Sequence, residues 1–380
     1  MPCTIVAPRF PSRRGVTSVL AMLYLVLFAC MAVGFYSASG TAVEVSQNEQ
    51  EQAISMGDAE SGMDFIRFQL AQAHSAMGET LEASTILEGE LPPFPELIYR
   101  MAWSFVRSAF LDRSFAGQDW LAWRDRFGNR LTTPLQACTA VAEMLASLGD
   151  PYTRLRSAEE TELTYSKARS TQLEIDRSGN PTRSSRSVLV EDLGENLGYI
   201  RLTNLSDPSA REAIRRALEK MAERDGLVLD LRGNPGGMAS DADAIAGFLM
   251  EPGEEMGRER TRFGEREYRS AQTRPLLPRT PLVILTDRRT ASAAEKLTAG
   301  LRDSGRAKVV GEETFGKGKG QVTRLLPGGV MVTVTAIENL TRAGEPIQER
   351  GVSPDVAGED AALEKAKEIL RKGQESKPPR

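Results

Sequence analysis

Hydrophobic and polar positions in the second half of the chain follow two periods, and their succession predicts repeated strand–helix–strand units. Short runs of leucine and β-branched residues, typical of strands buried in a parallel sheet, precede stretches in which apolar residues recur every three or four positions. We expect strands at 197–202, 227–231, 281–286, 307–310 and 329–337, and helices at 208–224, 241–250 and 292–303. The pattern therefore predicts an α/β core of βαβ units.

Other patterns divide the rest of the chain into segments. Amphipathic helical patterns occupy 97–110, 118–127 and 135–148 before the core and 360–372 after it, and 172–176 and 187–191 read as two short strands. The expected segments are a basic start and apolar helix at 1–43, a polar helical stalk at 44–96, a helical region at 97–165, a linker or hairpin at 166–195, the α/β core at 196–358, and a C-terminal helix and tail at 359–380.

An uncharged stretch near the N-terminus predicts a membrane anchor. No charged residue occurs from 15 to 43, and residues 19–36 are almost wholly apolar, long enough at about 1.5 Å per residue to cross most of a bilayer. Arginines precede this stretch and glutamates follow it, so we expect a single-pass inner-membrane protein whose remaining chain is exported to a periplasmic or extracytoplasmic side. Small residues at 37–42 would suit a signal-peptidase cleavage site, so the alternative is a cleaved secretory signal and a secreted protein.

Composition narrows the possible chemistry. The 380 residues carry a net charge of −4 without a concentrated basic run in the core, which gives no reason to expect a nucleic-acid partner. The three cysteines are scattered, so neither a disulfide framework nor a cysteine metal site is expected. The single histidine, His74, lies far before the core, which disfavours a Ser-His-Asp relay and histidine metal sites. We therefore expect no metal and no other cofactor.

A serine and a lysine are predicted to lie at one edge of the sheet. Ser292 follows the strand at 281–286 and opens a helix, and Lys317 follows the returning strand at 307–310. Because the crossover of a βαβ unit brings the chain back to its starting side, both loops lie at the same edge. Neighbouring strands are about 4.8 Å apart, so the two side chains can meet. A largely uncharged lysine could then act as the base for a serine nucleophile.

Each of these residues also has a simpler interpretation. Ser292-Ala-Ala-Glu295 is a capping-box pattern, in which the serine and the glutamate cap the helix. Lys317 could belong to a solvated basic loop, or to a phosphate-binding loop after the strand, although Gly318 replaces the required Ser or Thr and residues 321–326 suggest a strand instead of a helix. Lys319 is a second candidate base, which spacing makes less favourable than Lys317.

Three motifs resemble those of the C-terminal processing peptidases, also called tail-specific proteases. They are, in order, Asp230-Leu-Arg-Gly-Asn-Pro-Gly-Gly237, Thr290-Ala-Ser-Ala-Ala-Glu295 and Phe315-Gly-Lys-Gly318. Gly351-Val-Ser-Pro-Asp355 resembles the family's closing motif, and the similarity begins near Leu97. The resemblance implies a crotonase/ClpP-like α/β core, with residues 196–358 as the catalytic part, in a serine endopeptidase that acts on polypeptide substrates.

The resemblance also implies roles for single residues. In the family the serine of the second motif is the nucleophile and the lysine of the third is the base, which implies Ser292 and Lys317. A family glutamine four residues after the lysine corresponds to Gln321, which would orient the lysine. The family's oxyanion hole implies that Gly236 or Gly237 acts together with Ala293. From the residues themselves, apart from the resemblance, we expect Phe315 to supply apolar cover for the amine and Glu295 to be a structural cap.

Two further features keep a second function open. The family usually carries a PDZ domain after a link resembled here by Asp150-Pro-Tyr-Thr-Arg154, but only about forty residues separate this link from Gly198. A PDZ domain is therefore missing or reduced to a remnant. Residues 13–70 resemble the N-termini of type IV pilin-like proteins, with Arg13-Arg-Gly before the apolar run. The alternative function is a catalytically inactive scaffold that binds peptides or assembles with pilus-like components; the sequence leaves the oligomeric state unknown.

Overall fold

The computed structural model describes residues 94–163, 187–207, 209–270 and 274–375, which all belong to one compact unit, Gly57–Arg380. The expected apolar helix at 19–36, the stalk at 44–96 and the strand at 172–176 lie wholly or almost wholly outside these residues. Within the residues that the structure describes, no helix is long and apolar enough to cross a membrane.

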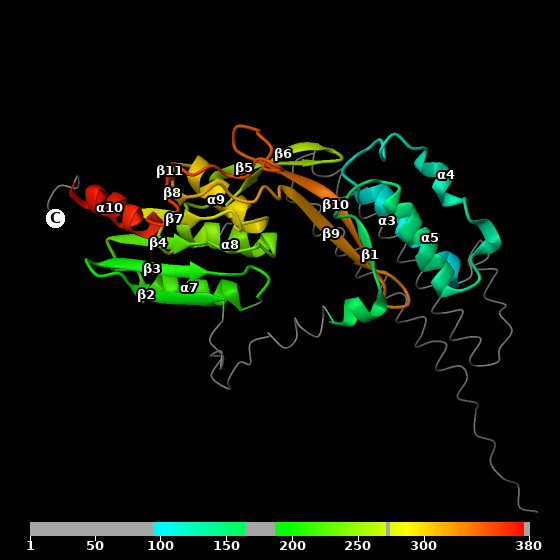
Figure 1. The fold of residues 1–380 in the computed structure, drawn as a ribbon, viewed down its shortest axis with the longest axis horizontal. Helices are drawn as coiled ribbons and strands as arrows, with labels where there is room; N and C mark the ends of the chain where they lie inside the picture. The colour runs from blue at the N-terminus through cyan, green and yellow to red at the C-terminus, as the bar shows by residue number, and fades with distance from the viewer. Residues whose placement is uncertain (1–93, 164–186, 208, 271–273, 376–380) are drawn as a thin grey trace, which may run out of the picture. The chain divides into compact units, whose positions relative to one another are not determined.

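A six-stranded sheet forms the centre of the core (Figure 1). Its order is β11-β8-β7-β4-β3-β2, and every neighbouring pair is parallel except β2 with β3. The strands are β2 (Val188–Asp192), β3 (Leu197–Leu202), β4 (Gly226–Asp230), β7 (Leu282–Thr286), β8 (Lys308–Gly311) and β11 (Val356–Ala357). The strands predicted at 197–202, 227–231, 281–286 and 307–310 are confirmed to within one residue at each end.

Helices cover both faces of this sheet. Leu229 and Ile284 face a core formed with α7 (Ala210–Lys220), α8 (Ala239–Leu249) and α9 (Ala293–Asp303). Val228 and Val283, one position earlier in each strand, face α10 (Ala362–Glu375) on the other side. Since successive side chains of a strand point to opposite faces, burial on both sides explains why these strands are continuous apolar runs.

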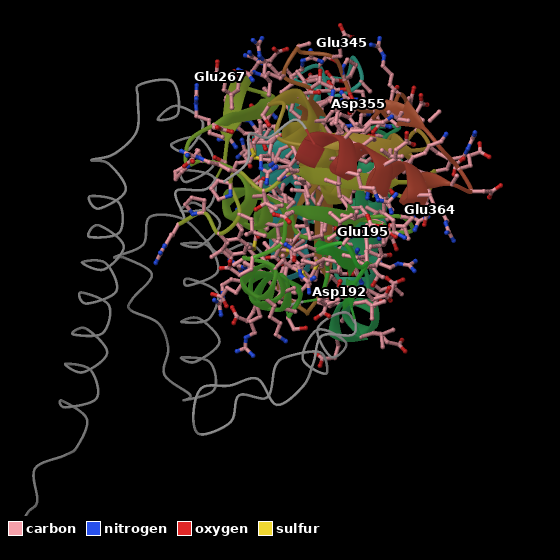
Figure 2. The ribbon with its side chains drawn as sticks, turned by 90° about the vertical axis from the view of Figure 1, so that its left-hand side faces the viewer. Asp192, Glu195, Glu267, Glu345, Asp355 and Glu364 are labelled. Atoms are coloured by element: carbon pink, nitrogen blue, oxygen red, sulfur yellow. The ribbon has the colours of Figure 1, made fainter. Side chains whose placement is uncertain are left out.

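An ion pair at the surface links the C-terminal helix with the turn between β2 and β3. Arg371 of α10 donates a hydrogen bond of 3.0 Å to Glu195, which lies in the turn between β2 and β3. Figure 2 labels Glu195 close to Asp192 and Glu364 on this side of the molecule. Both partners are about half exposed, so the pair contributes little free energy of folding compared with the apolar contacts of α10.

A second sheet is organised around β10 (Met331–Leu340). This long strand pairs with β1 (Arg154–Arg156), β5 (Glu255–Thr261) and β9 (Lys319–Leu325), and β6 (Gly264–Arg269) continues the sheet beyond β5. The strand predicted at 329–337 corresponds to β10. Because β9 is a strand that begins two residues after Lys317, the alternative of a phosphate-binding loop is wrong: such a loop opens a helix.

The helical region before the core packs against the second sheet. Its helices are α3 (Phe94–Ala109), α4 (Trp120–Arg124) and α5 (Pro134–Ala146), and the short 3-10 turn η2 (Gly128–Arg130) lies between α4 and α5 in the chain. Their aromatic and aliphatic side chains share one core with Val332 and Val334 of β10. The helix predicted at 118–127 is shorter than expected, because the Asp119 side chain caps it by accepting the Leu121 N–H (3.0 Å) and it ends at Arg124.

Candidate active site

Ser292 occupies a strained turn between β7 and α9. Its backbone angles are φ 55° and ψ −121°, a region that non-glycine residues rarely adopt. Such a sharp strand-to-helix turn resembles the elbow that presents a nucleophilic serine in hydrolases. The turn is fixed from the neighbouring strand, because Ala291 N–H donates to the Asn234 carbonyl (2.9 Å) and the Thr290 hydroxyl donates to the Leu231 carbonyl (2.9 Å). The half-buried serine is therefore held by its surroundings.

The fully buried Glu295 connects the serine turn with the lysine loop. Its Oε2 atom accepts the backbone N–H of Ser292 (2.7 Å) and that of Lys317 (2.8 Å). Its Oε1 atom accepts the Gly316 N–H (2.6 Å) and the Thr314 hydroxyl (2.5 Å). The two distances at Oε2 place the backbone nitrogens of Ser292 and Lys317 no more than about 5.5 Å apart, their sum. Glu295 caps the helix as the sequence predicted, and it also clamps the second loop.

Lys317 lies in the loop between β8 and β9, and its side chain is half-buried. Its Nζ atom is 5.3 Å from the centroid of the Tyr152 ring, within the range of a cation–π interaction. Among the described residues, no hydrogen bond joins this amine to the Ser292 hydroxyl. Phe315, expected to cover the amine, is 63% exposed. The structure thus brings the two loops together, without a hydrogen bond between the two side chains.

The glycine turn after β4 packs directly on the serine. The buried Asn234 side chain donates to the Leu202 carbonyl (2.9 Å) and accepts the N–H of Gly236 (2.8 Å). A Cβ atom on Gly236 would lie 2.8 Å from Ser292 Cβ, so only glycine fits at this approach. The next residue, Gly237, forms an isolated parallel bridge with Leu205.

Two backbone N–H groups near the contact between the glycine turn and the serine turn donate no hydrogen bond to any residue that the structure describes. Gly237 N–H and Ala293 N–H have no hydrogen-bond acceptor within the part of the chain that the structure describes. Ala293 is the first residue of α9, where an N–H has no partner inside the helix. A Cβ atom on Gly236 would also lie 2.8 Å from the Ala293 nitrogen, which shows that the glycine turn borders this donor. Backbone donors at a helix N-terminus suit a developing negative charge.

Gln321 and Lys319 lie on β9, beyond the lysine loop. The Gln321 amide donates to the Lys319 carbonyl (3.0 Å), and no hydrogen bond to Lys317 accompanies it in the described ranges. Lys319 Nζ lies 4.0 Å from Asp150 Oδ1 and belongs to a separate ion pair. Of the two candidate lysines, Lys317 is therefore the one whose backbone is tied to the serine turn.

Another lysine lies one turn beyond the serine and was not considered from the sequence. Lys296 is 4% exposed and pairs with Asp243 (3.0 Å) and Glu259 (3.0 Å). Burial raises the pKa of the Asp243 carboxyl, while the nearby Lys296 charge opposes that shift. Because its amine lies between two carboxylates, Lys296 belongs to a structural ion-pair network. The described residues contain no group of three or more metal-ligating side chains.

Sequence reasoning missed Tyr152 and Asn234 as members of the site. Tyr152 belongs to the Asp150-Pro-Tyr-Thr-Arg154 segment, which we interpreted only as a link. Tyr152 precedes the α/β core and Lys317 lies late within it, so their proximity cannot be recognised from nearby positions in the sequence. Asn234 lies inside the first of the three motifs, and its polar side chain at the end of a buried strand was a usable signal.

Comparison with known proteins identifies the family. The family described as Peptidase family S41 matches residues 196–357. A carboxyl-terminal-processing protease from Picosynechococcus sp. is 31% identical over 337 residues, covering 67% of this chain and 81% of the relative. The carboxy-terminal processing protease CtpA of Bacillus subtilis is 32% identical over 204 residues, covering 51% of this chain and 43% of that protein.

A solved structure agrees with these matches. The photosystem II D1 C-terminal processing protease has 25% sequence identity and a TM-score of 0.56, covering 70% of this chain and 93% of the other. The S41 match includes the glycine turn, the serine turn and the lysine loop. The chain therefore belongs to peptidase family S41, the carboxyl-terminal-processing proteases, which are serine peptidases.

Proposed function

We propose that the chain is a membrane-anchored endopeptidase in which Ser292 is the nucleophile and Lys317 the base, and which processes or degrades exported proteins. The shared acceptor Glu295 Oε2 carries this proposal, because it holds both backbones within about 5.5 Å of each other. A flexible lysine side chain can reach across such a separation. Catalytic hydrogen bonds are often loose without substrate and tighten when it binds. The missing side-chain contact is therefore compatible with catalysis.

The proposed reaction is acyl transfer. The neutral Lys317 amine takes the proton of the Ser292 hydroxyl as Oγ attacks the peptide carbonyl, and the resulting ammonium protonates the leaving amine. Water then attacks the acyl-enzyme, Lys317 accepts its proton, and Ser292 leaves with a proton returned from the ammonium. Each cycle restores both residues and consumes one water molecule per peptide bond.

In this proposal the oxyanion hole consists of the N–H groups of Gly237 and Ala293. Gly237 is preferred to Gly236 because the Gly236 N–H already donates to Asn234. Removing one such donor typically costs about 10²–10³ in kcat. Gln321 would orient the amine from the start of β9, where its amide now holds the Lys319 carbonyl.

The membrane anchor and the fold subclass are also proposals. The apolar stretch at 19–36, with arginines before it and glutamates after it, supports an anchor that leaves the catalytic part outside the cytoplasm. A cleaved signal and a secreted enzyme are the alternative. Protease protection and membrane fractionation of the full chain distinguish them. The successive βαβ units support a crotonase/ClpP-like core.

Two observations favour the second candidate function, an inactive peptide-binding or assembly scaffold. The described residues contain no hydrogen bond between Ser292 and Lys317, and the expected apolar cover is absent on the side of Phe315, which is 63% exposed. A base that is not desolvated is a poor one at neutral pH. The scaffold would bind unfolded polypeptides and release them uncut.

A cleavage assay separates the two functions. The full chain is incubated with an unfolded protein, and new fragments are sought by mass spectrometry. We expect Ser292→Ala and Lys317→Ala each to abolish cleavage with unchanged thermal unfolding. Lys308→Ala, which removes a 65% exposed lysine side chain of β8, is the matched control and keeps full activity. Undiminished hydrolysis in both site variants would refute the dyad, and absence of cleavage by the unsubstituted chain would favour the scaffold.

A further inference from the structure

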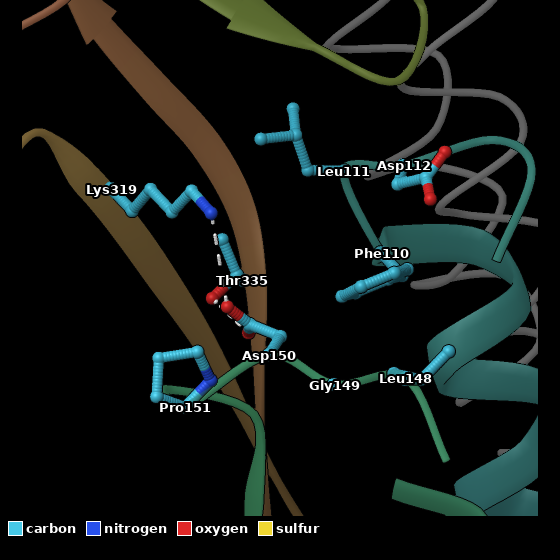
Figure 3. Close-up of a pocket in the computed structure, with 9 residues that line it drawn as sticks. All are labelled: Phe110, Leu111, Asp112, Leu148, Gly149, Asp150, Pro151, Lys319 and Thr335. Carbon is cyan, nitrogen blue, oxygen red and sulfur yellow. Dashed lines mark hydrogen bonds and ion pairs between the residues drawn. The ribbon is translucent and has the colours of Figure 1, made fainter. Parts of the chain in front are cut away.

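A pocket of about 190 Å³ lies beside the lysine loop, between the end of α3 and strands β9 and β10 (Figure 3). Its apolar lining comes from four residues of the helical region and the link: Phe110, Leu111, Leu148 and Pro151. Its polar lining includes Asp150 and Lys319, whose side chains point toward each other in Figure 3. The volume suits a single amino-acid side chain, and nothing in the proposed mechanism uses this space.

One oxygen of Asp150 accepts no hydrogen bond within the described part of the chain. The Asp150 side chain is 6% exposed, and its Oδ2 atom accepts the hydroxyls of Thr153 (2.5 Å) and Thr335 (2.6 Å). Its Oδ1 atom is buried without a hydrogen bond within the described part of the chain. Lys319 Nζ, at 4.0 Å, is too far away to donate one. Because a buried acceptor without a hydrogen bond costs free energy, a ligand that donates a hydrogen bond to Asp150 Oδ1 would be favoured in the pocket.

The charges of the pocket restrict what can fill it. A cationic group would meet the Lys319 ammonium, and an anionic group would meet the Asp150 carboxylate. The other carboxylate of the lining, Asp112, already accepts hydrogen bonds from its own loop, namely from the N–H groups of Ser114 (2.8 Å) and Ala116 (2.8 Å). A neutral group that donates to Asp150 Oδ1 and accepts from Lys319 Nζ satisfies both partners. A carboxamide has these two functions side by side.

The pocket adjoins the proposed base. Asp150 and Pro151 lead directly to Tyr152, whose ring lies 5.3 Å from Lys317 Nζ. Lys319 follows Lys317 by two residues, at the start of β9. The two chain segments that carry the polar lining therefore also border the lysine amine. The pocket is therefore connected to the proposed base by neighbouring residues on both segments.

We propose that this pocket is a substrate subsite that takes a carboxamide side chain, glutamine or the shorter asparagine. The apolar walls pack against the methylene stem, Asp150 Oδ1 accepts from the amide nitrogen, and Lys319 donates to the amide oxygen. The inference rests on the proposed function, because it assumes that a polypeptide lies across the serine turn. It adds a sequence preference at one substrate position.

Peptide binding tests the subsite without requiring cleavage. A randomised decapeptide pool is equilibrated with the full chain carrying Ser292→Ala, and the bound peptides are sequenced by mass spectrometry. We expect glutamine to be enriched over leucine, glutamate and lysine by about tenfold at one position, the size expected for a hydrogen bond to a charged group. Cleavage of the same pool by the chain with Ser292 intact reports separately on the proposed function.

Two substitutions in the Ser292→Ala background should shift the preference in opposite directions. Lys319→Met keeps the stem and removes the donor, so the carboxylate remains alone and basic side chains become enriched. Asp150→Asn removes the negative charge, so Lys319 remains alone and glutamate becomes enriched over glutamine. Lys308→Met, which removes a loosely paired lysine of β8, is the control and should leave the glutamine preference unchanged.

Three results would overturn the proposal. The first is a flat profile at every position, which would mean that only water fills the pocket. The second is a glutamine preference that Lys319→Met leaves intact. The third is the absence of any bound peptide. Lys319→Met decides the case even if Asp150→Asn disturbs the fold through its two threonine partners. If the intact chain cuts the pool but the binding profile is flat, the subsite fails and the peptidase proposal stands.

Discussion

Replacing Glu295 by glutamine tests the feature on which the site depends. The carboxylate accepts four hydrogen bonds, two at each oxygen, and every one comes from the serine turn or the lysine loop. A carboxamide has almost the same shape but a single acceptor oxygen. Its NH₂ group would face two of the four donors. The substitution therefore changes the hydrogen bonding of the site while its volume stays the same.

The free-energy cost follows from the number of lost acceptors. At least two donors lose their acceptor in either orientation of the amide, and hydrogen bonds to a charged group contribute about 1.5–3 kcal/mol each. The expected destabilisation is therefore about 3–6 kcal/mol, near the lower end if the Thr314 hydroxyl rotates to another partner. Since domains are stable by only about 5–15 kcal/mol, the unfolding midpoint should fall markedly. Activity should fall further, because the two loops are no longer held together.

Urea unfolding and the cleavage rate per folded molecule measure the two effects separately. The matched control is Glu259→Gln, which removes another buried carboxylate that pairs with Lys296 and Arg266 but has no hydrogen bond to the serine turn or the lysine loop. It should lower stability and keep most of the cleavage rate per folded molecule. If Glu295→Gln behaved like this control, or unfolded like the unsubstituted chain, the carboxylate would not be the clamp of the site.

Three further predictions follow from the same structure. Gly236→Ala should abolish cleavage, because its Cβ would overlap Ser292, whereas Gly305→Ala, with a similar positive φ but open space around it, should only lower the unfolding temperature slightly. Replacing the exposed Met238 and Phe315 by serine should raise KM several-fold with little change in kcat, since Met238 follows the glycine turn and the Phe315 N–H donates to the Thr290 carbonyl beside the serine turn, while neither has a role in the proposed reaction. Arg215 and Arg216 hold the pKa of Glu212 at about 2, below its ordinary 4.5. The ionised carboxylate therefore stabilises the folded state above pH 4.5, and this stabilisation is lost as the pH falls toward 2. Because the pair is partly exposed, Glu212→Gln should reduce the pH dependence of the stability only slightly in that window, measured by urea unfolding at each pH.

The parts of the fold that the sequence predicted well are those buried on both faces. Strands such as β4 and β7 contact helices on each side, so they appear as unbroken apolar runs whose ends are easy to place. The hairpin of β5 and β6 was not predicted, because its strands are mostly charged. Its two strands pair through their backbones, and oppositely charged side chains face each other across them, such as Arg260 with Glu265 (2.8 Å) and Arg266 with Glu259 (2.9 Å). Such pairs become visible only when the partner strand is known.

Topology alone predicted which loops meet at the site. A parallel crossover places the ends of β7 and β8 at one edge, and this rule brings the serine turn and the lysine loop together without knowledge of any side chain. The rule does not reach Tyr152, because its segment enters the site from the helical region through pairing of β1 with β10. The neighbours of the lysine amine could therefore not be predicted from the order of the core strands.

A glycine of the lysine loop allows its backbone to approach a neighbouring segment closely. A Cβ atom on Gly318 would lie 2.3 Å from the backbone nitrogen of Gln348, so only glycine permits this packing. The Gln348 side chain accepts the N–H groups of Gly318 and Lys319 at 3.1 Å each. The backbone of the loop is thus fixed on one side by Gln348 and on the other by Glu295. In the proposed mechanism, only the Lys317 side chain would then have to change its position for the dyad to form when a bound substrate excludes water from the amine.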